Sequence, residues 1–158
     1  MTHKVHEHII RIGDEGISRR ALFRGLEASV RHPERFNEHM DGARVLSEES
    51  IDGGVMLRRE IDFGSFSFRD CVLLREPDSV LTLVEAGKTW PASSLLMKIE
   101  EPEPGSLFVR FLYEEEEKKG DKGENPAIAS LRKKAYEAKD QYLIARILEE
   151  IERSGAKD

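Results

Sequence analysis

Between Ala43 and Glu116, short turn signals divide the chain into segments in which apolar and polar residues alternate. The turn signals are Asp52-Gly53-Gly54, Gly64-Ser65, Pro77-Asp78 and Pro102-Glu103-Pro104-Gly105. Alternation with a period of two predicts strands, here over residues 43–51, 54–63, 66–75, 79–85, 94–101 and 106–116. Such short turns leave no room for the crossovers that parallel strands need, so we predict an antiparallel meander.

Further elements precede this meander. Residues 5–12 alternate in the same way and predict a seventh strand, with His8 on the face that also carries isoleucines. Ser18 is a suitable N-cap for a first short helix. Pro33 suits the first position of a second short helix that reaches about Glu38. The predicted order is therefore a strand, two short helices and six strands.

A long helix is predicted to end the chain. Asn125 and Pro126 supply an N-cap and a first-turn proline, and Gly155 supplies a stop, so we expect a helix over about 126–153. An apolar stripe with heptad-like spacing follows this segment, and we expect it to lie on the concave face of the sheet. The stripe contains Ile128, Leu131, Ala135, Ala138, Tyr142, Ala145 and Leu148, and it widens at Leu143, Ile144, Ile147 and Ile151.

The chain has 158 residues, which fits a single α+β domain over 1–158 with one core. Its formal net charge is -6 and its acidic residues are dispersed, so a nucleic-acid partner is not expected. The N-terminus lacks a signal-peptide pattern and no apolar run has membrane-spanning length, so we expect a cytoplasmic protein that does not insert into membranes. Residues 114–125 are predicted to form a flexible acidic loop.

No cofactor or metal site is expected. Cys71 is the only cysteine, which excludes a disulfide within the chain and any multi-cysteine metal site. His6 and His8 have the spacing that lets two imidazoles reach one metal ion, but the sequence offers no evident third ligand.

Arg59 and Asp70 are predicted to face each other inside the protein. A two-residue turn at Gly64-Ser65 pairs them across the third and fourth predicted strands, on the more apolar face of that hairpin. A buried guanidinium needs a partner of opposite charge, which the carboxylate provides. The pair is either purely structural or also orients a polar group of a ligand.

The same strand parity predicts an apolar cavity between the sheet and the last helix. Tyr113 and His8 are its remaining polar candidates, either simply hydrogen-bonded or able to transfer protons. With Arg59 and Asp70 they are the four candidate catalytic residues. The predicted ligand-binding residues are His8, Leu57, Arg59, Ile61, Phe68, Asp70, Val72, Met97, Ile99, Val109, Phe111, Tyr113, Ala138 and Tyr142.

The predicted order of elements resembles the helix-grip superfamily of START domains, birch-pollen-allergen-like proteins and polyketide cyclases, often called SRPBCC. More specifically, residues 101–111 (EPEPGSLFVRF), His6-Glu7-His8 and Leu57-Arg58-Arg59 are similar to its AtaL-like subgroup. The resemblance implies a seven-stranded curved antiparallel sheet wrapped around a long C-terminal helix, with a hydrophobic ligand cavity between them. It brings no shared catalytic motif.

Three functions fit these expectations. The first is binding of a small hydrophobic or aromatic molecule in the internal cavity. The second is an enzyme of polyketide cyclase type, in which one of the four polar candidates polarises a carbonyl group or moves a proton. The third is a protein-interaction module that uses the exposed sheet face or the acidic loop.

Overall fold

The structure is a computed structural model that describes residues 1–13, 16–117 and 125–158. Its helices are α1 (Arg19–Arg31), a single 3-10 turn (Pro33–Arg35) and α2 (Pro126–Ser154). Its strands are β1 (Thr2–Arg11), β2 (Gly42–Ile51), β3 (Gly54–Asp62), β4 (Ser67–Arg75), β5 (Ser79–Val84), β6 (Ser93–Glu103) and β7 (Ser106–Glu116). No helix in these described ranges is long and apolar enough to cross a membrane.

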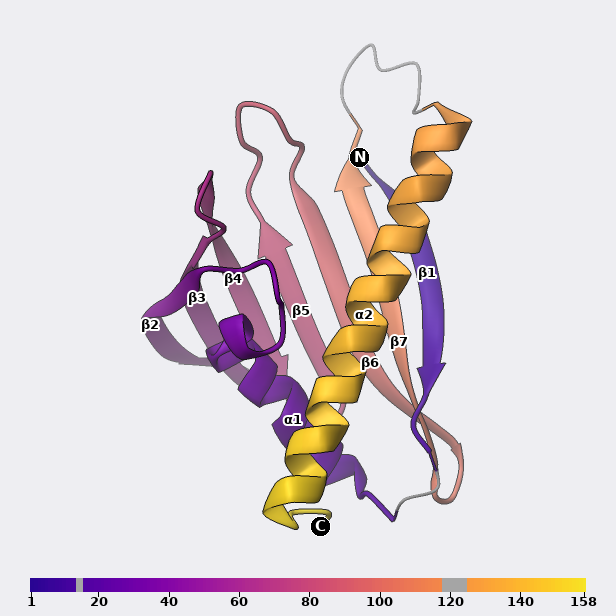
Figure 1. Cartoon of the computed structure of the whole chain (residues 1–158). Coiled ribbons are helices and arrows are strands. Elements are labelled where there is room, and N and C mark those ends of the chain that lie inside the picture. Colours follow the sequence, from indigo (N-terminus) through magenta and orange to yellow (C-terminus); the bar gives the residue numbers. More distant parts are fainter. Residues whose placement is uncertain (14–15, 118–124) are drawn as a thin grey trace.

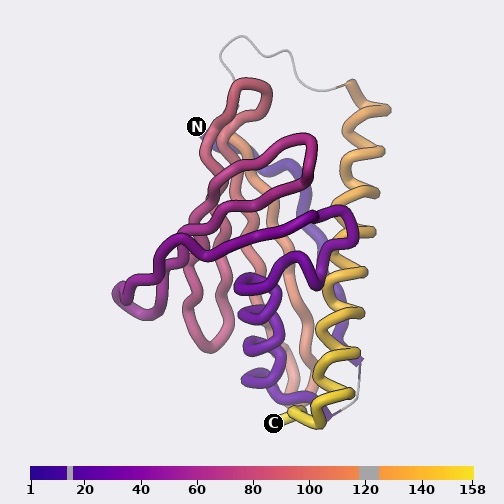
Figure 2. The backbone as a smooth tube through the Cα atoms, turned by 60° about the vertical axis from the view of Figure 1, so that its left-hand side comes forward, coloured from indigo at the N-terminus to yellow at the C-terminus, as the bar shows by residue number. Residues whose placement is uncertain are grey.

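The seven strands form one antiparallel sheet in the order β1-β7-β6-β5-β4-β3-β2. The sheet is curved, and α1 and α2 both lie on its concave side (Figures 1 and 2). The predicted fold class, a helix-grip arrangement with a meander and a long terminal helix, is confirmed. The meander register is also as predicted, because Arg59 pairs with Asp70 and Ile61 with Phe68.

Helix α1 fills the end of the concave side that lies beside the C-terminal half of α2. Leu22 and Leu26 are fully buried there, at the four-residue spacing that places side chains on one helix face. Gly25 lets the two helices approach closely, because a Cβ atom at this position would lie 2.4 Å from Cγ2 of Ile147. The sequence predicted α1 but not its contact with α2. Because the buried side chains of both helices belong to one core cluster, this part of the interior is solid core.

The buried face of α2 matches the predicted stripe only where that stripe widens, at Ile144, Ile147 and Ile151. Ile144 and Ile147 are buried, whereas Ile128 is 56% exposed, Leu131 66% and Tyr142 37%. Successive residues of an α-helix are about 100° apart, which puts the heptad-like positions such as Leu131 and Tyr142 nearly opposite the buried isoleucines. The helix has apolar residues on both faces, and the isoleucine face is the bulkier, so it packs against α1 and the sheet.

Two further segments differ from expectation. The second short helix ends at Arg35 instead of about Glu38, because the Asn37 side chain accepts a hydrogen bond from the backbone N–H of His39 at 3.0 Å and forms a local turn. Strand β7 continues to Glu116, so the first residues of the predicted acidic loop are strand. Residues 118–124 of that loop lie outside the described part of the chain.

Candidate functional site

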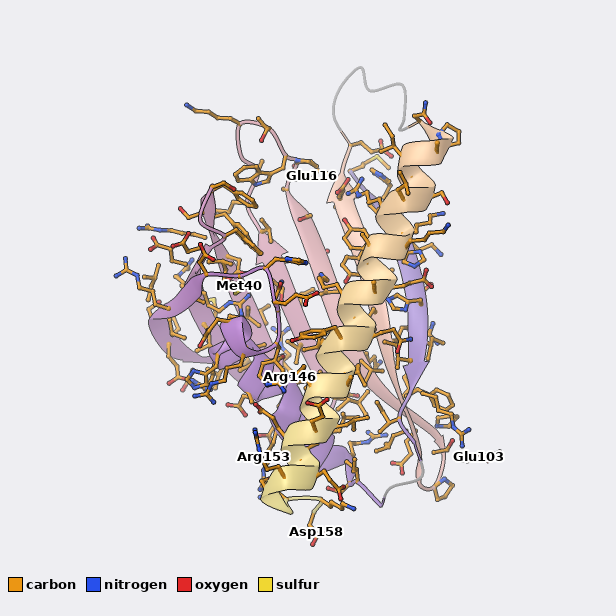
Figure 3. All side chains as sticks on the ribbon, viewed as in Figure 1. Met40, Glu103, Glu116, Arg146, Arg153 and Asp158 are labelled. Atoms are coloured by element: carbon orange, nitrogen blue, oxygen red, sulfur yellow. The ribbon has the colours of Figure 1, made fainter. Side chains whose placement is uncertain are left out.

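A cavity of about 320 Å³ lies between the sheet and the middle of α2. Its walls come from β3, β4, β5, β6, β7 and α2, from the last turn of α1, and from the segment that joins α1 to β2. Met40 in that segment is among the lining residues and is marked in Figure 3. Helix α1 fills the end of the concave side beside the C-terminal half of α2, so the hollow occupies only the other end.

The structure brings six of the predicted ligand-binding residues to this cavity. They come from β3, β4, β6 and β7, and their side chains face inward as the predicted parity requires. These six residues are Arg59, Ile61, Phe68, Asp70, Met97 and Tyr113.

Five other predicted residues face inward but do not line the cavity. They lie in the solid core with the side chains of α1, and each is at most 1% exposed. They are Leu57, Val72, Ile99, Val109 and Phe111. Their inward direction was predicted correctly, but their place in the site was wrong because the side chains of α1 and α2 pack with them in one core cluster.

The prediction that Ala138 and Tyr142 line the cavity is wrong. Both are exposed, on the side of α2 that faces away from the core. The cavity-lining residues of α2 are instead Tyr136, Lys139 and Asp140, followed by Leu143.

Arg59 and Asp70 form a two-point ion pair in the cavity wall. The Nε of Arg59 donates to Oδ1 of Asp70 at 2.9 Å, and Nη2 donates to Oδ2 at 2.6 Å. The Nη1 of Arg59 donates to the backbone carbonyl of Val30 at 2.8 Å, near the end of α1. A guanidinium group has five N–H donors, so these bonds leave one donor on Nη1 and one on Nη2. The pair fixes α1 to the sheet and retains donors for a further acceptor.

Asp140 is the functional residue that the sequence did not reveal. It is fully buried, and its carboxylate accepts hydrogen bonds from the Tyr113 hydroxyl at 2.8 Å to each oxygen. Its Oδ2 also lies 2.7 Å from Nε2 of His8. One signal could have identified it, because Asp140 shares a helix face with Ile144, Ile147 and Ile151 and so is an acidic residue on an apolar face.

The buried position of this cluster determines its proton affinities. Burial raises the pKa of Asp140, although the ammonium of Lys139 and the hydrogen bonds from His8 and Tyr113 oppose the rise. Burial and the neighbouring Asp140 carboxylate raise the pKa of Tyr113 far above its ordinary value. The Tyr113 hydroxyl therefore stays protonated and donates a hydrogen bond to Asp140. The hydroxyl oxygen of Tyr113 can still accept a hydrogen bond from a molecule in the cavity.

Aromatic rings and one ammonium group flank this cluster. The rings of Tyr113 and Tyr136 are stacked with their centroids 4.0 Å apart. Lys139 is exposed as a residue, but its Nζ turns inward to lie 5.1 Å from the centroid of the Tyr113 ring. His8 was predicted to line the cavity, but it does not: it is hydrogen-bonded to Asp140, and its ring stacks on Phe111 at 5.1 Å. This wall offers flat ring faces together with an acceptor and a cation.

His6 stacks on His8 with ring centroids 5.2 Å apart, but its Nε2 is 3.9 Å from Oε2 of Glu137 and forms no hydrogen bond. Burial lowers the pKa of His6. In the part of the chain that the structure describes, no three acidic, histidine or cysteine side chains are grouped so that they could hold a metal ion.

Comparisons with known proteins place this geometry in a family. Residues 13–154, most of the chain, match the family described as acetylaranotin biosynthesis cluster protein L, or AtaL. No curated protein matches the sequence.

Solved structures share the fold. The chain is similar to the Zhui aromatase/cyclase from Streptomyces sp. R1128, with a TM-score of 0.65 and 12% identity over 97% of this chain and 95% of that one. It is similar to a START superfamily protein from Mycobacterium smegmatis, with a TM-score of 0.61 and 16% identity over 91% and 97% of the two chains. It is also similar to Ara h 8.0201, with a TM-score of 0.60 and 11% identity over 94% of this chain and 99% of that one. The chain belongs to the AtaL family, within the SRPBCC superfamily of helix-grip proteins.

Proposed function

We propose that this protein binds a small hydrophobic or aromatic molecule in the cavity between the sheet and α2. The observation that carries the proposal is a hollow of about 320 Å³ with mostly apolar walls and a few polar groups directed into it. Ligand sites in proteins commonly combine apolar walls with a small number of placed polar groups. A hollow of this size corresponds to a ligand of one or two rings.

The polar groups favour a ligand with a matching polar substituent. Arg59 has N–H donors left over that suit a carbonyl or carboxylate oxygen, and the Tyr113 oxygen suits a hydroxyl or N–H donor. The stacked rings of Tyr113 and Tyr136 suit a flat ligand. A hydroxylated or carbonyl-bearing aromatic compound meets all three conditions.

The first experiment identifies what the protein carries. The chain is purified under native conditions, its small molecules are extracted, and they are identified by mass spectrometry. We expect a hydrophobic or aromatic compound at a substantial molar ratio to protein, and at a much lower ratio from a variant with a blocked cavity.

Thr82→Phe is the blocking variant, because Thr82 lines the cavity from β5. Leu83→Phe is its matched control, because the next residue of the strand points to the opposite face and is 39% exposed. The uncharged dye N-phenyl-1-naphthylamine serves as the probe, with its fluorescence as the readout. We expect Thr82→Phe to abolish the signal and Leu83→Phe to retain it. Equal binding by the two variants would show that the dye lies elsewhere and would refute the proposal.

A second candidate function is an enzyme of polyketide cyclase type, favoured by the buried Asp140 carboxylate at the cavity wall. A carboxylate with a raised pKa is a better proton acceptor than an exposed one. Asp140 would take a proton from a carbon atom next to a carbonyl group, while the N–H groups of Arg59 would stabilise the oxygen of the resulting enolate. The shared fold with an aromatase/cyclase is compatible with this chemistry.

Deuterium exchange tests this second candidate. Benzoylacetone, an aromatic 1,3-diketone, is incubated with the protein in D₂O, and loss of its methylene proton signal is followed by NMR. We expect exchange above the buffer rate, its loss in Asp140→Asn and its reduction in Tyr113→Phe. Tyr142→Phe is the matched control, because Tyr142 lies on the exposed face of α2. Exchange at the buffer rate, or unchanged exchange in Asp140→Asn, would exclude this role for Asp140.

A further inference from the structure

A second hollow, also of about 320 Å³, lies between α1 and the C-terminal half of α2. None of the residues that line it lines the first cavity. Its floor is apolar and small, because the two helices meet closely at Gly25 and Ile147. Ala21 and Ile151 complete the floor. We call this hollow the α1–α2 groove.

Arginine side chains from three elements surround the α1–α2 groove. Arg24 comes from α1, Arg35 from the 3-10 turn and Arg153 from α2, and all three line it. Arg146 is close by, since its Nε donates to the backbone carbonyl of Arg35 at 3.3 Å. Figure 3 shows Arg146 and Arg153 on the side of α2 that faces α1. Positive charge is therefore concentrated here, although the whole chain has a net charge of -6.

The acidic residues beside the groove pair with Arg146 and Arg153 and leave the charges of Arg24 and Arg35. The Nη1 of Arg146 donates to Glu149 at 2.9 Å, and Glu150 lies 4.0 Å from Nη2 of Arg146 and 3.6 Å from Nη2 of Arg153. Within the described ranges, the side chains of Arg24 and Arg35 form no hydrogen bond or ion pair. Two exposed guanidinium groups thus point to a hollow without a protein partner.

We propose that the α1–α2 groove binds an organic anion, namely a phosphate or carboxylate group on a short apolar stem. The planar guanidinium group matches the oxygen geometry of phosphates and carboxylates, and Arg24 and Arg35 supply two of them from separate elements. The floor residues Ala21 and Ile147 are buried, so the apolar surface of the groove that still meets water is at Gly25 and Ala156. An inorganic anion would leave that surface in contact with water, whereas a short alkyl stem covers it. The ligand is therefore amphipathic, and its site is independent of the first cavity.

Calorimetric titration at low salt tests the proposal with four probes: hexyl phosphate, hexanoate, inorganic phosphate and hexanol. We expect one or both of the hexyl anions to bind more tightly than inorganic phosphate and hexanol, and the tighter anion identifies the head group. Binding of hexanol as tight as that of the hexyl anions would overturn the claim that charge is recognised. Binding of inorganic phosphate as tight as that of hexyl phosphate would overturn the role of the apolar floor.

Variants locate the site. Arg24→Gln and Arg35→Gln should each weaken binding of the hexyl anion on the order of tenfold, because each removes a charged hydrogen-bond donor. Arg44→Gln is the matched control, since Arg44 is exposed on β2 and pairs with Glu60 away from the groove. Weakening by Arg44→Gln equal to that by Arg24→Gln would show only a general charge effect and would overturn the proposal. Binding should persist in Thr82→Phe; its loss there would assign the anion to the first cavity.

Discussion

Arg59 and Asp70 lie directly opposite each other on β3 and β4 and are joined by two parallel hydrogen bonds inside the protein. The side chains are 9% and 2% exposed, so neither charge is well hydrated. A third bond from Arg59 to the Val30 carbonyl attaches α1 to the same pair. One ion pair thereby joins two strands and a helix at the edge of the cavity.

Asp70→Ala should lower the free energy of unfolding by about 3 kcal/mol or more, because it leaves the Arg59 guanidinium buried without a counter-charge. Urea denaturation followed by circular dichroism measures the change. The double variant Arg59→Met with Asp70→Leu should recover much of the loss, since it removes both charges and keeps the volume. Wild-type stability of Asp70→Ala would mean that the guanidinium reaches water.

Asp140→Asn should gain stability relative to the wild type as the pH rises. The pKa of Asp140 is raised above its ordinary value of 3.8, so the folded state holds this proton more tightly than the unfolded state. The wild-type free energy of unfolding therefore falls, by up to about 1.4 kcal/mol per pH unit, as the pH rises from about 4 through the folded pKa. Asparagine carries no proton to lose, so the variant lacks this fall.

Urea denaturation of the wild type and Asp140→Asn from pH 4 to pH 8 measures that difference. Asp52→Asn, in the turn between β2 and β3, controls for the loss of one exposed acidic charge. A difference between Asp140→Asn and wild type that stays constant over this range would contradict the raised pKa.

Gly25→Ala should destabilise the protein, although alanine is the better helix former by about 1 kcal/mol. The new methyl group would lie 2.4 Å from Cγ2 of Ile147, a buried β-branched side chain with little room to move, and such overpacking costs about 1–3 kcal/mol. Thermal unfolding monitors the effect. Gly42→Ala is the control, because a Cβ atom there has no neighbour within 4 Å among the described residues.

The contact itself can be confirmed with a double variant. Gly25→Ala combined with Ile147→Ala should be more stable than the two separate losses predict, because the second substitution removes the atom that the first one meets. Strict additivity would show that the loss in Gly25→Ala does not arise from this contact.

The sheet could be predicted because its signals are local. Each strand alternates with a period of two, and glycine or proline marks the turns, so the Gly64-Ser65 turn alone fixes the register that places Arg59 opposite Asp70. The buried face of α2 could not be predicted from local signals of this kind. Its sequence has one apolar stripe through Leu131 and another through Ile147, and only the packing of α1 decides which is buried.

The cavity was predicted in place but not in extent. Strand parity correctly assigned Met97 and Phe111 to the inner face, but only Met97 lines the hollow. Phe111 is instead covered by the ring of His8, which is held against Asp140 of α2. Asp140 was missed because it lies in a helix rich in charged residues, and its burial results from the tertiary contacts with His8 and Tyr113.

The concave side has a filled end and a hollow end, so different residues determine the stability of the fold and the shape of the hollow. Folding relies mainly on the side chains around Leu26 and Ile147, whereas the shape of the hollow depends on residues such as Thr82 and Met40. Substitutions at such residues, unlike those at the Arg59–Asp70 ion pair, can therefore accumulate without loss of the folded state. A protein arranged in this way can change the molecule it accommodates over evolutionary time while keeping its architecture.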